Sequence, residues 1–178
     1  MNRQMTILGT MKNESLMEVA GKQLDRVLGF FPRVEAKISA LFAVDIAMLA
    51  ALALNARAQD FAVWYLTALG VIAVVALAAS IWFLYRASFP QLQGGASSLI
   101  YFHEIAKRTE SAYLAEMKEC DAEKLASEML AQVWRNSEIL RDKFIGVKHA
   151  FMCTAAAVPF WFLALLFASM QHATLVVK

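Results

Sequence analysis

The sequence is 178 residues long, with 60% hydrophobic residues, only 18% charged residues and a net charge of +2. A soluble domain of this size rarely reaches such values, and the small net charge gives no indication of a nucleic-acid partner. The two cysteines, Cys120 and Cys153, have the spacing of neither a disulfide framework nor a metal site. The composition therefore favours one domain-sized unit whose hydrophobic core is shared with lipid.

The N-terminal segment, residues 1–35, is predicted to stay outside the membrane. Residues 1–13 are polar, show no apolar pattern and are expected to be mobile. From Glu14 to Phe31 a weak apolar stripe predicts an amphipathic helix, which is expected to pack against another helix or to lie on the membrane surface. Pro32 then marks a boundary and suits the first turn of a new helix.

A transmembrane hairpin is predicted over residues 36–84, with spans at about 36–54 and 66–84. A third span is predicted at 151–170, where Pro159 removes a backbone hydrogen bond and is expected to bend the helix. The second span has a face of small residues that permits close helix contact: Gly70, Ala73, Ala76, Ala79 and Ser80. The fold class predicted from these segments is an all-α membrane protein.

Asp45 lies near the middle of the first span. A carboxylate at that depth costs a few kcal/mol even on lenient scales. Asp45 should therefore face a helix partner, hold a proton or line a water-filled path. Hydrogen bonding within the bundle and a functional role in gating both remain open, and Pro159 is the other candidate gating residue.

The segment at 85–148 is predicted to be a cytosolic helical hairpin with a sensing role. After a linker rich in helix-breaking residues, Ser98 is a plausible N-cap for a helix from Leu99 to Met117. Lys118 to Asp121 is expected to form a turn, with Asp121 capping a second helix that runs without a break into the third span. One continuous helix would thus connect a water-facing region to the bilayer.

Lysine and arginine counts predict the orientation. The segment before the first span has five and the segment between the second and third spans has nine, whereas the connection between the first two spans has only Arg57 and the tail only Lys178. The positive-inside rule therefore predicts that the N-terminus and the helical hairpin lie in the cytoplasm and that the C-terminal tail lies outside.

No arrangement of residues predicts catalysis or a metal site. His103-Glu104 begins like a zinc-binding helix motif, but Lys107 stands where the second histidine is required. Polar residues near the packing faces of the cytosolic hairpin either hydrogen-bond across it or form a pocket for a ring and an anion. The candidate ligand-binding residues are Tyr101, His103, Lys107, Gln132, Arg135, Asn136 and Ser137.

Three stretches carry a resemblance to a known family: Glu35-Ala36-Lys37, Ser98–Phe102 with Ile105-Ala106, and Gln132–Ile139 followed by Lys143-Phe144. In these stretches and in the order of its parts, the chain resembles the transmembrane effectors of bacterial Pycsar anti-phage defence, from about Leu24 to Phe167. The resemblance implies an inner-membrane effector paired with a pyrimidine nucleotide cyclase. It further implies activation by cyclic UMP or cyclic CMP, and death of the infected cell through membrane damage, as in abortive infection.

Two other functions are weighed against this one. The first is a structural or adaptor membrane protein whose cytosolic hairpin docks a partner protein. The second is an enzyme, for which the sequence offers no cluster of acid, base and nucleophile. A pore-forming effector also requires a homo-oligomer, because three spans from one chain cannot enclose a channel.

Overall fold

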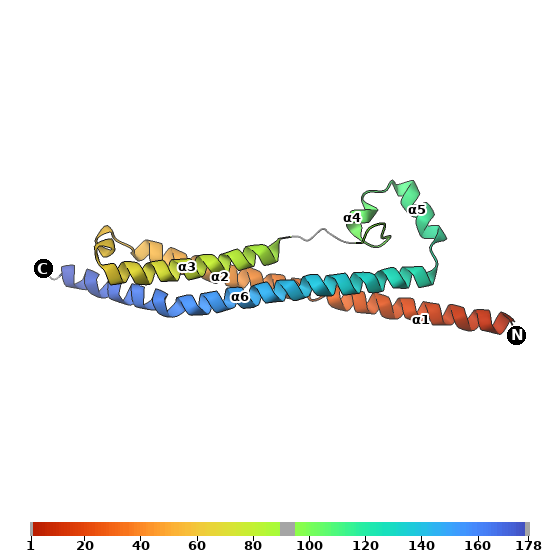
Figure 1. Ribbon diagram of the computed structural model, residues 1–178, viewed down its shortest axis with the longest axis horizontal. Coiled ribbons are helices and arrows are strands. Elements are labelled where there is room, and N and C mark those ends of the chain that lie inside the picture. Colours follow the sequence, from red (N-terminus) through yellow and green to blue (C-terminus); the bar gives the residue numbers. More distant parts are fainter. Residues whose placement is uncertain (1, 90–94, 177–178) are drawn as a thin grey trace. The chain divides into compact units, whose positions relative to one another are not determined.

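The computed structural model describes the backbone of residues 2–89 and 95–176, and the side chains of residues 15–58, 60–89 and 95–171. Within these ranges the chain is helical and contains no strand (Figure 1), which confirms the all-α class. The elements are α1 (Asn2–Leu28), α2 (Phe31–Asn55), η1 (Ala58–Ala62), α3 (Trp64–Ser88), α4 (Phe102–Ile105), α5 (Glu110–Glu119) and α6 (Ala122–Val176).

The chain divides into two compact units. The polar unit comprises Met1–Arg33 and Pro90–Arg141, and the membrane unit comprises Val34–Phe89 and Asp142–Lys178. Helix α6 contributes residues to both units. The predicted continuous helix is therefore confirmed.

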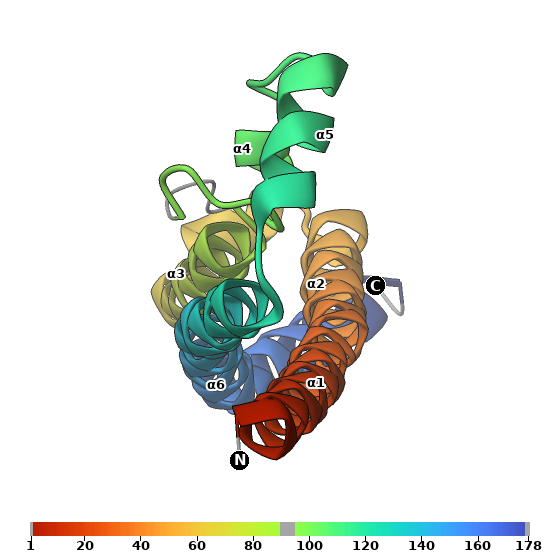
Figure 2. The same cartoon turned by 90° about the vertical axis from the view of Figure 1, so that its right-hand side faces the viewer.

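The membrane unit packs α2, α3 and the C-terminal part of α6 side by side (Figures 1 and 2). Three helical stretches of the described chain are long and apolar enough to cross a membrane, and they contain the predicted spans: Ser15–Asn55, Trp64–Ser88 and Ala122–Gln171. Large apolar side chains such as Phe42, Val75 and Phe162 face outward, as lipid contact requires. The three helices meet at Met48, Leu77 and Ala157, against which Trp161 packs.

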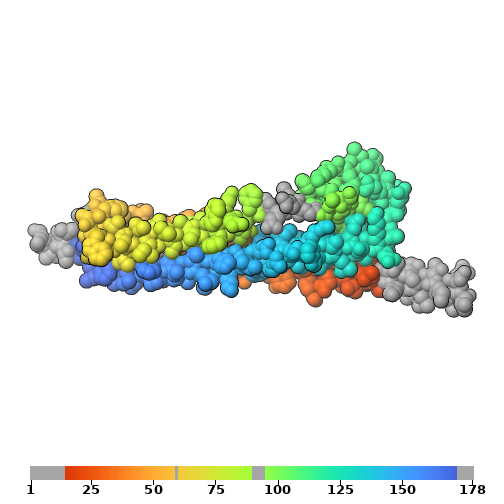
Figure 3. Space-filling model, viewed as in Figure 1, coloured from red at the N-terminus to blue at the C-terminus, as the bar shows by residue number. Residues whose placement is uncertain are grey.

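Small buried residues let α3 and α6 approach closely, and Figure 3 shows the two helices in contact along much of α3. Up to residue 171, where the described side chains end, the buried positions of α6 in this unit are four alanines and one threonine: Ala150, Thr154, Ala157, Ala164 and Ala168. Gly146 belongs to the same contact, because a Cβ atom there would lie only 2.8 Å from the Cβ of Ala87. On α3, Ala73 and Ser80 of the predicted small-residue face are buried.

In the polar unit α1 lies alongside the start of α6 (Figure 2), where Ala20 and Ala126 are fully buried. Helix α1 begins at Asn2, so the prediction that regular helix starts only at Glu14 was wrong. Pro32 stands in the first turn of α2, as predicted. Asp121 precedes α6 and accepts a 2.7 Å hydrogen bond from the Lys124 N–H, which confirms the predicted cap.

The predicted helix from Leu99 to Met117 was wrong, because two helices stand there. Helix α4 is only four residues long, and Thr109 begins a new helix by accepting a hydrogen bond from the Ala112 N–H. Ser98 does not cap a helix starting at Leu99; its hydroxyl accepts from the N–H groups of Ile100 and Tyr101 within a tight loop. Arg108 lies in the break between the two helices and donates to the carbonyls of Ser97, Ser98 and Glu104.

Candidate functional site

A polar cluster lies inside the membrane unit and joins all three predicted spans. Asp45 comes from α2, Ser80 from α3 and Thr154 from α6. The Ser80 hydroxyl donates to Asp45 Oδ2 at 2.6 Å, and the Thr154 hydroxyl donates to Asp45 Oδ1 at 2.7 Å. The two hydroxyl oxygens are 2.9 Å apart. We call these three residues the Asp45 cluster.

The Asp45 cluster is closed to solvent. Asp45 and Ser80 are 0% exposed, and Thr154 is 6% exposed. A buried polar group without a partner costs several kcal/mol in an apolar medium, and here each carboxyl oxygen has its own hydroxyl donor. Of the three arrangements expected for Asp45, the structure shows the one with helix partners. A role for Asp45 in gating stays a prediction.

Two further polar contacts tie α6 to the other spans. The indole N–H of Trp161 donates to the carbonyl of Met48 on α2 at 2.9 Å, so Trp161 packs inside the bundle. The Lys143 ammonium donates to the carbonyl of Ala87 at 2.9 Å, and it lies 3.8 Å from Glu35. Ala87 is near the C-terminal end of α3, where carbonyls lack helical partners and a cation is favoured. Pro159 lies within α6, and its gating role is a prediction.

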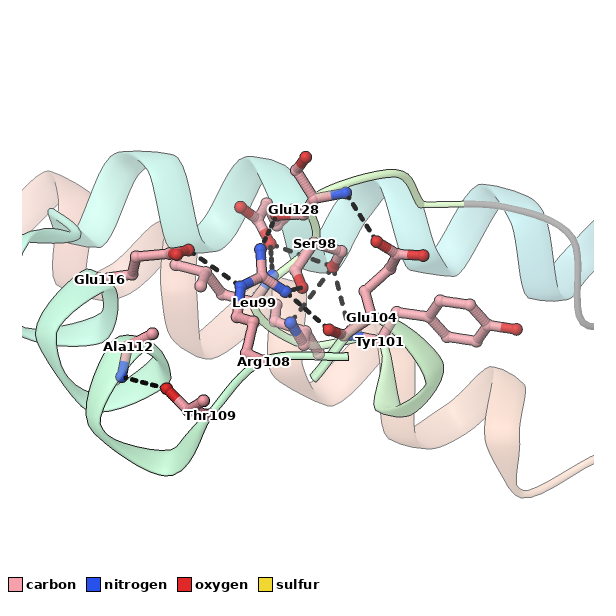
Figure 4. Close-up of polar contacts among 11 residues, drawn as sticks. Ser98, Leu99, Tyr101, Glu104, Arg108, Thr109, Ala112, Glu116 and Glu128 are labelled. Carbon is pink, nitrogen blue, oxygen red and sulfur yellow. Dashed lines mark hydrogen bonds and ion pairs between the residues drawn. The ribbon is translucent and has the colours of Figure 1, made fainter. Parts of the chain in front are cut away.

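A second polar cluster lies in the polar unit, where a loop meets α6 (Figure 4). One oxygen of Glu128, Oε2, accepts from the Leu99 N–H at 2.7 Å and from the Ser98 hydroxyl at 3.1 Å. Gln132, one turn further along α6, is 6% exposed, and its side-chain amide lies 3.5 Å from the Ser98 hydroxyl. We call Ser98, Leu99, Glu128 and Gln132 the Glu128 cluster.

Arg108 and Glu104 hold the loop in place. The Arg108 guanidinium donates to the carbonyls of Ser97 and Ser98 and also to the carboxylate of Glu116 (Figure 4). Glu104 accepts from Lys107 and from the Ser97 N–H. These hydrogen bonds, with Lys107 as the larger cause and Ser97 next, lower the pKa of the Glu104 carboxyl below its usual value.

The seven predicted ligand-binding residues fall into three groups. The side chains of Gln132 and Arg135 lie close to Gly95. A Cβ atom added to Gly95 would be only 2.5 Å from Arg135 Nη1 and 3.1 Å from Gln132 Nε2. Gly95 has a φ of +69°, which favours glycine. Asn136 and Ser137 instead donate to carbonyls one turn back on their own helix, those of Gln132 and Val133.

In the third group, the rings of Tyr101 and His103 are 6.1 Å apart, and Lys107 is paired with Glu104. Sequence reasoning missed Glu128 and Arg108 and treated Ser98 only as a cap. One signal in the sequence could have found Glu128. It precedes Gln132 by four residues, so both side chains lie on one face of the helix.

An apolar cleft of about 520 Å³ lies in the membrane unit, between η1, α2, α3 and α6. Its lining includes Leu52, Leu66 and Val74, and among the described residues that line it Asp60 is the one acidic residue and none is Lys or Arg. A phosphate-bearing ligand requires cationic or N–H donors. The chemistry of the Glu128 cluster suits such a ligand better than this cleft does.

A family model described as the Pycsar effector protein domain matches residues 19–169 of the chain. The match contains the Asp45 cluster and the Glu128 cluster. No curated protein and no solved structure shows significant similarity to the chain.

Proposed function

The chain belongs to the Pycsar effector family, and we propose that a cyclic pyrimidine nucleotide activates it to impair the membrane that it spans. Family membership supports an anti-phage effector role, and the three apolar helices support a location in a membrane. The proposal adds the ligand class, cyclic UMP or cyclic CMP, made by a partner pyrimidine nucleotide cyclase. It also adds that the protein acts by binding rather than by catalysis, and that the damage kills the infected cell.

The proposed orientation places the polar unit where the nucleotide is made. Lysine and arginine residues are concentrated before the first span and between the second and third. The positive-inside rule then puts these segments in the bacterial cytoplasm and the C-terminus in the periplasm.

The Asp45 cluster is the observation that carries the proposal of membrane damage. It is a polar centre within an apolar bundle, and its hydroxyl donors come from α3 and α6. A shift or rotation of α6 would take the Thr154 hydroxyl away from Asp45 and leave a carboxyl oxygen without a donor in an apolar medium. Such a group draws water toward it. Several copies must assemble for these groups to line an opening.

Helix α6 supplies the route from ligand to membrane. It contains Glu128 and Gln132 of the Glu128 cluster and also Thr154 of the Asp45 cluster. A ligand that binds one position of α6 better than another shifts the population toward that position.

Dye release from vesicles tests the proposal. The purified chain is reconstituted in vesicles that hold a self-quenching dye, and cyclic UMP, cyclic CMP or cyclic AMP is added. We expect release with a cyclic pyrimidine nucleotide and none with cyclic AMP or with empty vesicles. No release at saturating cyclic UMP and cyclic CMP would overturn the proposal.

A variant connects the response to the Asp45 cluster. Thr154→Val keeps the shape of the side chain but removes the hydroxyl that Asp45 accepts from. We expect this variant to release dye at lower nucleotide concentrations than the parent chain. Ser169→Ala is the matched control, since Ser169 is exposed and its hydroxyl donates only to Leu166 on its own helix.

A further inference from the structure

The Glu128 cluster brings three hydrogen-bond donors together beside a single carboxylate. The Ser98 hydroxyl and the Leu99 N–H converge on one oxygen of Glu128, while the Gln132 amide lies beside the same hydroxyl. These donors are held firmly, because Ser98, Leu99 and Gln132 are all buried. A backbone N–H, a hydroxyl and an amide at one place form a typical anion-binding set.

Arg135 adds a cation without a matching anion. Its guanidinium lies next to buried Gly95, where Gln132 also lies. Among residues 15–58, 60–89 and 95–171, no hydrogen bond, ring contact or ion pair of Arg135 is found. A half-buried guanidinium suits an anion with several terminal oxygens, because its N–H groups form a rigid fork.

The carboxylate of Glu128 and a cyclic phosphate share the chemistry that these donors recognise. Each is a monoanion that presents two equivalent terminal oxygens. Resting on the proposed function, we propose that Glu128 is an internal competitor of the activating ligand: its carboxylate occupies the place that the cyclic phosphate of the nucleotide takes, and ligand binding displaces it. The phosphate then accepts from Ser98, Leu99 and Gln132 and pairs with Arg135.

Displacement makes the two states of the site mutually exclusive. Without ligand, Glu128 holds the loop against α6 through Ser98 and Leu99. With ligand, the loop is held by the phosphate and Glu128 is released from it. The contacts on the face of α6 that carries Glu128 and Gln132 therefore differ between the bound and the free state. A ligand can shift a conformational equilibrium only through such a difference in contacts.

Glu128→Gln tests the competition directly. The glutamine keeps the size of the side chain and one acceptor oxygen but loses the negative charge. Charge-assisted hydrogen bonds are about twice as strong as neutral ones, so the internal competitor becomes weaker and the ligand should bind roughly tenfold more tightly. Glu123→Gln is the matched control, since Glu123 is an exposed acid in the first turn of the same helix.

The measurement is the dissociation constant of the detergent-solubilised full chain for four probes at constant ionic strength. Cyclic UMP and cyclic CMP are the proposed ligands, dimethyl phosphate is a minimal monoanionic phosphodiester, and uridine is an uncharged nucleoside. We expect Glu128→Gln to bind the proposed cyclic nucleotide and dimethyl phosphate more tightly and uridine no better. Glu123→Gln should match the parent chain with all of them.

The outcomes separate this inference from the proposed function. If cyclic nucleotides bind the parent chain but Glu128→Gln binds them no better, the inference is overturned and the proposed function stands. If dimethyl phosphate gains affinity in Glu128→Gln but neither cyclic nucleotide binds any variant, the anion site stands and the proposed nucleotides are wrong. If none of the three phosphodiesters binds any variant, both are overturned.

Arg135→Gln provides an independent test, because among the residues that the structure describes this side chain makes no hydrogen bond, ring contact or ion pair that the change would break. It removes the unmatched cation, and we expect at least tenfold weaker binding of the cyclic nucleotide with an unchanged helical circular dichroism spectrum. An unchanged dissociation constant would remove Arg135 from the site and overturn the inference.

Discussion

The hydroxyl of Ser80 on α3 donates a 2.6 Å hydrogen bond to the carboxyl group of Asp45 on α2. Both side chains are fully buried, so the contact fixes which faces of the two helices meet. Thr154 extends the same contact to α6. The interior of this apolar bundle is thus ordered by a small number of polar groups, and their loss has consequences that stability measurements can detect.

Ser80→Ala should destabilise the membrane unit. The change leaves Oδ2 of Asp45 without its closest donor, and an unsatisfied buried polar group costs about 1–3 kcal/mol. Thermal unfolding in detergent should show a lower midpoint for this variant than for Ser169→Ala, whose hydroxyl lies on an exposed face. Equal midpoints for the two variants would contradict a structural role for the Ser80–Asp45 contact.

Gly146→Ala should destabilise the contact between α3 and α6. The new Cβ would lie 2.8 Å from the Cβ of Ala87 and 3.5 Å from the carbonyl oxygen of Phe83, and overpacking of this kind costs about 1–3 kcal/mol. Gly70→Ala is the control, because a Cβ there has nothing within 4 Å. It should be neutral or slightly stabilising, since alanine favours a helix more than glycine does. The same unfolding midpoint for both variants would argue against close approach at Gly146.

Trp161→Phe should weaken the attachment of α6 to α2. Phenylalanine fills most of the space but cannot donate to the Met48 carbonyl, and the lost hydrogen bond is worth about 0.5–1.5 kcal/mol. Trp134→Phe should have a smaller effect, because Trp134 is 64% exposed. The unfolding midpoints of the two variants decide between a packing role and a surface role for Trp161.

Glu104 should make the polar unit sensitive to acid. Its pKa in the folded chain lies below the usual 4.5, chiefly because of Lys107 and then the Ser97 N–H. The unfolded chain therefore takes up the proton first as the pH falls. The stabilisation is fully present above pH 4.5 and is lost as the pH falls further, through the folded pKa.

The check is the unfolding midpoint as a function of pH for the parent chain and for Glu104→Gln. The two midpoints should differ most near neutral pH and converge under acid conditions. Lys107→Met removes the main cause of the lowered Glu104 pKa. This variant should therefore reduce the loss of stability in acid, as Glu104→Gln does. Parallel curves at every pH would show that Glu104 contributes nothing through its charge.

The spans could be predicted because their signal is local. Long apolar runs, Pro32 at a helix start and Asp121 as a cap each depend on neighbouring residues only, and the structure agrees with all of them. The family resemblance was also visible in short stretches of sequence, and the family match confirms it.

The contacts between distant residues could not be predicted. Ser80 and Thr154 are ordinary small polar residues in apolar runs, and only packing of the helices shows that both face Asp45. In the break between α4 and α5, Arg108 reaches back to the carbonyls of Ser97 and Ser98. Glu128 resembles any surface glutamate of an amphipathic helix until the loop is folded against it.

The spacing of the Asp45 cluster along the chain bears on how the protein enters a membrane during synthesis. Ser80 follows Asp45 by 35 residues, whereas Thr154 follows it by 109. The first two spans can therefore leave the ribosome as a pair in which Asp45 already has one donor, which lowers the cost of inserting it. The third span then brings the second donor. The cluster is therefore completed only after that span has been made, and the bundle reaches its sealed form only when all three spans have been inserted.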